Sequence, residues 1–322
     1  MKIYKLSIVF LFLIFTSWSS FSQNYPSKPI RLIVPFPPGG VADIIARPLA
    51  ENLSSLLGQS VIIENKAGAT GTIGASFVAN SAPDGYTLLL GTSNEIAMSP
   101  SLFKTLPYDP NKAFTPISPV GEFPNVLVVG PHLPVKSFND FLSLIRKDPG
   151  KISFASSGTG STNHLTAVLF ANQAKLSIQH VPYKGGGPAV ADLLGGHVDA
   201  LFATLPSAIV QIKAGKLQAL AVTGEYRSSL LPDVPTIREL GIIGVSVTTW
   251  NGVLGPANIS PVIVQQINKA IATIVSQQNF KDKMQSVGVE AISTQPQEFL
   301  IRIRGEYEKW SNLVRGSNLI LD

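Results

Sequence analysis

The stretch VPFPPGGVADIIARPLAENL, residues 34–53, places a glycine turn at the start of a helix-like pattern. The apolar run at 29–36 that leads into it is bounded by prolines, which is typical of a buried strand. After the turn, apolar residues recur at helical spacing, at Ile44, Ile45, Leu49, Leu53, Leu56 and Leu57. A strand, a glycine turn and an amphipathic helix in succession indicate an α/β protein. The two glycines leave the backbone at the N-terminus of this helix uncovered by side chains.

The rest of the chain repeats this alternation. Further strands, some with the turn that follows them, are expected at 60–65, 86–95, 124–130, 152–158, 176–187 and 245–256. Because helix-like patterns separate most of them, the sheet should be largely parallel. A segment rich in proline and turn residues, 104–120, precedes the second alternating series.

Two α/β lobes explain this order better than one long sheet. Each lobe is predicted to be a mainly parallel sheet flanked by helices, with a ligand cleft between the lobes. Strands near 124–129 and 245–254 are the expected crossings. The predicted boundaries are 23–125 plus 250–322 for lobe 1 and 126–249 for lobe 2.

The first residues indicate a secretory signal peptide, 1–22. Lys2 and Lys5 precede an apolar run at 6–15, and small residues at Ser20 and Ser22 suit a cleavage site. The run is too short to cross a bilayer core of about 30 Å as a helix. The alternative is an uncleaved anchor. Cleavage predicts an exported protein.

Composition excludes several classes of protein. The chain of 322 residues has no cysteine, which excludes a disulfide framework and a lipid-modified cysteine. The 25 basic and 20 acidic residues form no Lys/Arg cluster of the kind that nucleic acid needs. No metal is expected, because the four histidines lack metal-ligand spacing. No cofactor is expected either, since neither a P-loop nor a dinucleotide-binding motif is present.

Glycine- and serine-rich turns stand out at 35–43, 67–74, 91–94 and 155–164. In parallel α/β sheets, ligands bind where such turns meet helix N-termini. The free amides and the dipole of a helix start form an anion socket that needs no arginine. A single turn of this kind usually serves only to connect a strand to a helix. Four of them, at comparable points of the two strand–helix series, favour binding of a small anion.

Two residues in these turns admit other readings. Asp43, in the first turn of its helix, is expected to cap that helix rather than contact a ligand. Gly40 is expected to have a positive φ. Phe36, Tyr183 and Trp250 are candidate walls of the cleft, although Trp250 equally suits the core between the lobes.

An exported hydrolase is the competing interpretation. Ser161 and His164 lie three residues apart on one predicted helix, and Asp199 is a candidate to orient the histidine. The segment lacks the G-x-S-x-G elbow that presents a nucleophilic serine, which argues against this chemistry. His164 otherwise fixes the loop or touches the ligand.

The chain resembles the Bug-type periplasmic solute receptors of tripartite tricarboxylate transporters. The resemblance rests on segments in order along nearly the whole mature chain, including YPSKPIRLIVPFPPGGVADIIAR, ENKAGATGTIGA, APDGYTLLLGTS, PGKISFASSGTGSTNHL, HVPYKGGGPAVADLLGGHVDALF and LPDVPT. It implies a two-lobed, type II-like periplasmic binding protein that closes over its ligand.

The same resemblance implies capture of a mono- to tricarboxylic acid for a membrane permease, with no catalysis. A receptor that feeds a signalling partner is the remaining alternative, and a monomer is expected. The implied ligand-binding residues are Phe36, Gly39, Gly40, Val41, Ala42, Asp43, Gly71, Thr72, Ile73, Ser93, Asn94, Ser156, Ser157, Gly160, Ser161, His164, Ala203 and Thr204.

One departure from the family pattern bears on the ligand. Many members have an Asp-Asn pair where this chain has Ala203 and Thr204. An amino acid would lack a counter-charge for its ammonium group there. Thr72 also stands where asparagine is frequent. Both changes leave the ligand's identity open and its class unchanged.

Overall fold

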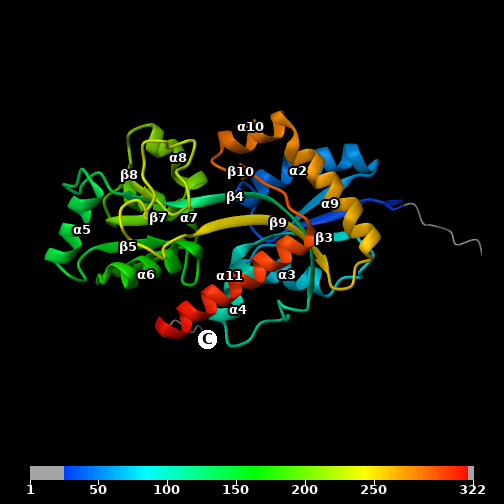
Figure 1. Ribbon diagram of the computed structural model, residues 1–322, viewed down its shortest axis with the longest axis horizontal. Coiled ribbons are helices and arrows are strands. Elements are labelled where there is room, and N and C mark those ends of the chain that lie inside the picture. The colour runs from blue at the N-terminus through cyan, green and yellow to red at the C-terminus, as the bar shows by residue number, and fades with distance from the viewer. Residues whose placement is uncertain (1–24, 318–322) are drawn as a thin grey trace, which may run out of the picture.

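The computed structural model describes residues 25–317, and the predicted signal peptide lies outside them. Two groups of helices and strands lie at opposite ends of the molecule, and two long strands, β4 (Phe114–Val129) and β9 (Thr248–Pro256), run between them (Figure 1). The strand order is β2-β1-β3-β9-β4-β7-β5-β6, with β8 and β10 also paired to β4. The predicted two-lobed α/β fold is confirmed.

The first lobe has a mixed sheet. β1 (Ile30–Val34) pairs in parallel with β2 (Val61–Asn65) and β3 (Thr87–Thr92), whereas β9 runs antiparallel to β3. Its short strand is β10 (Glu290–Ala291). Its helical segments are α2 (Val41–Leu57), η1 (Ala69–Gly71), α3 (Thr72–Ala79), η2 (Asn94–Met98), α4 (Ser99–Leu102), α9 (Pro261–Ser276), α10 (Gln278–Ser286) and α11 (Pro296–Ser317).

The second lobe repeats this plan. β5 (Ser153–Ser156) pairs in parallel with β6 (Gln179–Pro182) and β7 (Ala200–Thr204). The end of β4 runs antiparallel to β7 and to β8 (Gln218–Val222). The helices are α5 (Phe138–Lys147), α6 (Thr162–Ala174), α7 (Gly186–Leu194) and α8 (Leu205–Lys213). The outer strands of both lobes are therefore parallel, and the crossing strands are antiparallel to their neighbours. The prediction of a mainly parallel sheet was wrong in this respect, because β4 and β9 run antiparallel to each other and to the strands beside them.

β4 begins earlier than the sequence indicated. Residues 114–120 were expected to belong to a turn-rich segment, but they pair with β9. The register shifts between Pro116 and Ser118 and again between Pro119 and Gly121. A proline cannot donate to a ladder and is tolerated in strands at such irregularities. The prolines thus bend this strand without ending it.

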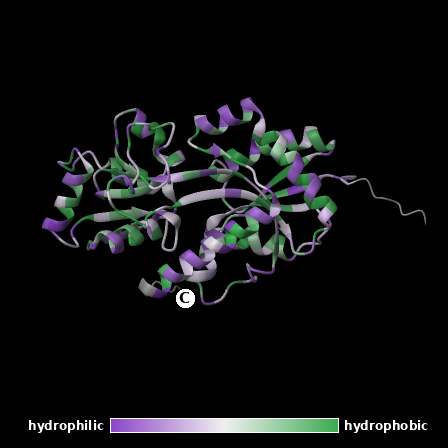
Figure 2. Cartoon of the chain, viewed as in Figure 1, coloured by the Kyte–Doolittle hydropathy of each residue, from purple (hydrophilic) through white to green (hydrophobic). Residues whose placement is uncertain are grey.

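Helix α11 connects the two lobes. Near its start, Phe299 packs on Trp250 with ring centroids 4.9 Å apart. Near its end, Trp310 and Val314 join a core cluster that contains both Leu102 of the first lobe and Phe154 of the second. Helix α10 is drawn mostly in the hydrophilic colour (Figure 2). Between residues 25 and 317, none of the helices has the length and apolar character needed to span a membrane.

Candidate ligand-binding site

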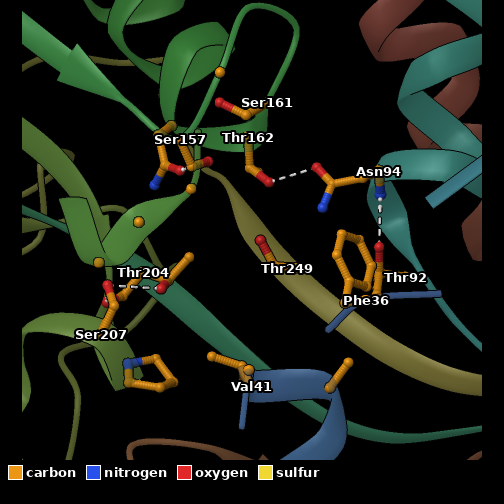
Figure 3. Close-up of a pocket in the computed structure, with 18 of the residues that line it drawn as sticks. Phe36, Val41, Thr92, Asn94, Ser157, Ser161, Thr162, Thr204, Ser207 and Thr249 are labelled. Atoms are coloured by element: carbon orange, nitrogen blue, oxygen red, sulfur yellow. Dashed lines mark hydrogen bonds between the residues drawn. The ribbon is translucent and has the colours of Figure 1, made fainter. Parts of the chain in front are cut away.

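A cavity of about 600 Å³ lies where the two lobes meet (Figure 3). Both crossing strands contribute to its lining, through Phe123 of β4 and through Thr249 and Asn251 of β9. Many residues that the sequence indicated also line it: Phe36, Gly39, Gly40, Val41, Ala42, Asn94, Ser157, Ser161, Ala203 and Thr204. Turns far apart in the sequence therefore converge on one space.

The N-terminus of α2 forms one wall. Gly40 is the N-cap, with φ −73°, and the positive φ of 80° belongs to Gly39. The expectation of a positive φ at Gly40 was therefore wrong, because the reversal of the chain occurs one residue earlier. The amide of Gly39 donates to Asp43 at 3.0 Å and that of Gly40 to the Pro37 carbonyl at 3.3 Å.

The amides that remain free lie one residue further on. Val41, Ala42 and Asp43 form the first turn of α2, and their N–H groups have no hydrogen-bond partner among residues 25–317. The helix dipole adds a positive partial charge at this end. Val41 and Ala42 line the cavity, so this wall can hold an anion by backbone alone.

Asp43 is a structural residue of this turn. Its side chain is 1% exposed, and besides Gly39 its carboxylate accepts from Arg47 at 2.8 Å and Asn65 at 3.1 Å. Burial raises the pKa of Asp43, but these three hydrogen bonds outweigh it and hold the pKa below its usual value. The residue lies in the first helical turn as predicted, and it is not among those lining the cavity.

The N-terminus of α6 forms the opposite wall. Ser161 caps this helix by accepting from the His164 amide at 3.4 Å, which leaves the amides of Thr162 and Asn163 without partners in the described chain. The Thr162 hydroxyl donates to the side-chain oxygen of Asn94 at 2.8 Å (Figure 3). This bond joins the two lobes across the cavity.

His164 lies behind this wall and does not line the cavity. Its Nδ1 accepts from the Gly160 amide at 3.1 Å, and its ring stacks on His180 at 3.8 Å. Burial, together with the neighbouring His180, lowers the pKa of His164 to about 4. The imidazole is therefore neutral at pH 7 and acts as an acceptor that fixes the loop.

The hydrolytic set proposed as an alternative is not assembled. None of the hydrogen bonds between described residues joins the Ser161 hydroxyl to the His164 ring. Asp199 bonds instead to His132 at 2.9 Å and to Ser153 at 2.7 Å. A nucleophile, a base and an orienting acid must be hydrogen-bonded in sequence, and these residues are not.

Several predicted residues lie outside the lining. Gly71 packs so closely on Glu95 that an added Cβ would lie 2.9 Å from its carboxylate, so this glycine serves packing. From the same turn, Thr70 lines the cavity instead. The others outside the lining are Thr72, Ile73, Ser93, Ser156 and Gly160. Of the candidate walls, Phe36 lines the cavity, whereas Tyr183 and Trp250 do not.

Sequence reasoning missed other lining residues. Lys184 is the one ionisable side chain in the lining, and Gly185, Gly186 and Gly187 follow it at the start of α7. Ser207, at the start of α8, accepts from the Thr204 hydroxyl at 2.9 Å and donates to the Thr204 carbonyl at 2.8 Å. The run YKGGG carried a signal for the first group, since it has the same turn chemistry as PPGG. Among residues 25–317, no group of three or more histidine, aspartate or glutamate side chains is placed to hold a metal ion.

The fold and this interlobe cavity are those of a periplasmic solute-binding protein. The sequence profile of the tripartite tricarboxylate transporter family receptor matches residues 45–319, and the chain belongs to that family. It is 38% identical over 295 residues to the protein BugT of Bordetella pertussis, which covers 91% of this chain and 90% of BugT.

Solved structures agree with this assignment. Rpa4515 of R. palustris, solved with adipate, superposes with a TM-score of 0.84 at 34% identity, covering 90% of this chain and 97% of the other. MatC from Rhodopseudomonas palustris, with bound malate, gives 0.81 at 30% identity, covering 90% and 100%. The predicted relation to Bug-type receptors is therefore confirmed.

Proposed function

We propose that this chain is the periplasmic receptor of a tripartite tricarboxylate-type permease and that it captures a small mono- to tricarboxylic acid. One observation carries the proposal. Two helix N-termini, those of α2 and α6, face one cavity from different lobes with first-turn amides that no described residue satisfies. Two carboxylates, or one carboxylate and a polar group, match such a pair of walls.

The charge of the lining supports the same ligand class. Its residues include Lys184 but no aspartate or glutamate. Ala203 and Thr204, which are uncharged, also line the cavity. An organic acid is attracted into this space, whereas an amino acid finds no counter-charge for its ammonium group. The adipate and malate in the two related structures are acids of this size.

The proposal also covers the location of the protein, its partners and the fate of the ligand. Residues 1–22 direct export and are then cleaved off. The mature protein acts as a monomer and passes its ligand to the membrane permease subunits without converting it. Membership of a receptor family and the separation of Ser161 from a base support binding without catalysis.

Closure of the cleft is also part of the proposed function. The proposed boundaries are 23–125 plus 250–322 for one lobe and 126–249 for the other. The change of partner along β4 supports a division near residue 125, because β4 bonds to β9 as far as Pro124 and to β7 from Asn125. The bond between Asn94 and Thr162 would then latch the closed form. Small-angle scattering should record a smaller radius of gyration with a saturating ligand, and an unchanged radius would contradict hinge closure.

Calorimetry with acetate, succinate, adipate and citrate tests the ligand class. At least one acid should bind with a stoichiometry of one and raise the melting temperature. A ligand at a hundred times its dissociation constant contributes about 2.7 kcal/mol to stability. Hydrolysis of a simple ester such as ethyl acetate, abolished by Ser161→Ala, would overturn the receptor in favour of a hydrolase. Native mass spectrometry of the gently purified protein identifies any retained acid and reports whether the protein is a monomer.

A further inference from the structure

The floor of the cavity is formed by one face of β9. Thr249 and Asn251 lie two residues apart on this strand, so they project to the same side, and both line the cavity. Trp250 between them projects to the other side, against Phe299. Asn251 pairs with Thr92 of β3 and Gly121 of β4, which places it in the middle of the sheet.

Both side chains are buried without partners. Thr249 is 4% exposed and Asn251 is 1% exposed. The hydroxyl of Thr249 and both the amide nitrogen and oxygen of Asn251 make no hydrogen bond to any described residue. Each such buried group costs about 1–3 kcal/mol, and native proteins retain few of them. Unpartnered polar groups of this kind are expected where a bound ligand supplies the missing hydrogen bonds.

The donors and acceptors on Thr249 and Asn251 indicate which ligand group can satisfy them. A carboxylate only accepts hydrogen bonds, so it can satisfy the amide nitrogen of Asn251 but not its oxygen. The oxygen needs a donor on the ligand. An ammonium group would donate, but none of the lining residues is an acid that would balance its charge. A hydroxyl group donates and accepts without charge, and it suits Asn251 and Thr249 together.

The position of these residues sets where the hydroxyl belongs. Thr249 lies between Ser161 and Thr162 on one side and Val41 on the other (Figure 3). These are the walls that carry the free amides of α6 and α2. A ligand with its carboxylates at the two walls would present its internal carbons to Thr249 and Asn251.

We propose that Asn251 and Thr249 are specificity-determining residues that recognise a hydroxyl group on an internal carbon of the ligand. The receptor then selects hydroxycarboxylates over acids with the same carbon skeleton and no hydroxyl. This inference rests on the proposed function and names the substrate class within it. A site that hydrogen-bonds a hydroxyl rejects the analogue lacking it, because its own polar groups stay unpaired.

Matched ligand pairs test the inference by calorimetry. The probes are succinate against 2-hydroxysuccinate and glutarate against 2-hydroxyglutarate. The wild-type protein should bind the hydroxylated member of at least one pair at least tenfold more tightly. Equal affinities within both pairs would overturn the inference and leave the proposed function intact. Binding of no carboxylate, in these pairs or in the wider panel, would instead remove the proposed function itself.

Two variants separate recognition from a structural role. Asn251→Leu keeps the approximate volume and removes both amide groups, so the affinity ratio should fall towards one while the plain acid still binds. Thr249→Val should lower the ratio less, because it removes one hydroxyl. The control, Thr115→Val, removes a hydroxyl that donates to the Pro256 carbonyl away from the cavity, and its ratio should stay that of wild type.

A second readout does not depend on the ligand. Because Asn251→Leu removes buried groups that lack partners, the ligand-free variant should melt at or above the wild-type temperature. A clear loss of ligand-free stability together with an unchanged affinity ratio would assign Asn251 to the fold and overturn the inference.

Discussion

The two faces of β9 treat polar groups in opposite ways. On the cavity side, Thr249 and Asn251 are buried and unpartnered. On the other side, the Trp250 indole donates to Glu306 at 2.7 Å, and Arg302 bonds to Glu306 at 3.2 Å and to Glu122 at 2.5 Å. One strand thus carries a face organised for a ligand and a face organised for the fold.

On the side of β9 that carries Trp250, the charged groups are paired because they are largely buried. Burial raises the pKa of Glu306, and the nearby Arg302 guanidinium opposes that shift. Lys309 donates to the Ser246 carbonyl beside the same group. A buried charge is tolerated when it is paired and hydrogen-bonded. Substitutions on this face should therefore change stability, whereas substitutions on the cavity side should change binding.

The largest effect is expected for Arg302→Met. It leaves Glu306 and Glu122 without their cation, and removing one partner of a buried pair costs about 3–5 kcal/mol. Because these side chains are 19–28% exposed, we expect the lower end of that range. Denaturant unfolding measures the loss. Arg304→Met, an exposed change on the same helix, should stay within about 0.5 kcal/mol of wild type. Equal stability of the two variants would show that the Arg302 contacts contribute little.

The next effect is a loss of stability in acid caused by His164. Its pKa is about 4 when folded and 6.5 in the unfolded chain, so the unfolded state takes up the proton first as pH falls. The contribution of the neutral His164 to the free energy of unfolding is fully present above pH 6.5 and is lost as the pH falls towards 4. The loss between pH 7.5 and 4.5 should be on the order of 2 kcal/mol.

The variant His164→Gln isolates this contribution from other titrating groups. Its stability should fall less than that of wild type over the same pH interval, because glutamine does not titrate. Parallel pH profiles for the two proteins would contradict the assignment of a neutral, buried imidazole.

The sequence predicted the lobes but not contacts such as that between His164 and His180. Alternating strand and helix patterns predicted the two lobes, since apolar periodicity reports burial directly. The stacking of His164 on His180 could not be predicted, because it joins α6 to β6 through tertiary packing. The role of Asn251 was also missed, since alternation along an apolar strand does not say which face meets a cleft. The turn at Gly39 was placed one residue late because either glycine fits PPGG.

A smaller effect is expected for Gly39→Ala. Gly39 has φ 80°, and a residue with a side chain in this region costs about 1–2 kcal/mol. An added Cβ meets nothing within 4 Å, so the cost is conformational and not steric. Gly305→Ala in α11 also meets nothing within 4 Å, but there alanine should stabilise the helix by up to about 1 kcal/mol. Unfolding curves with shifts of the same sign would contradict this account of the turn.

The central claim is that first-turn amides of α2 hold a ligand carboxylate, and Val41→Pro tests it most directly. Proline is favoured at the first helical position, and Gly40, at ψ 169°, already has the conformation required before it. The substitution therefore removes one amide donor and leaves the helix in place. Val41→Ala is the matched control, because it shortens the side chain and keeps the amide.

Calorimetry with an acid that binds the wild-type protein gives the decisive comparison. Losing a charge-assisted hydrogen bond costs about 1.5–3 kcal/mol, or roughly ten- to a hundredfold in affinity. Val41→Pro should show that loss, while Val41→Ala should bind within a few-fold of wild type. A folded Val41→Pro protein that binds the acid as tightly as wild type would contradict the claim.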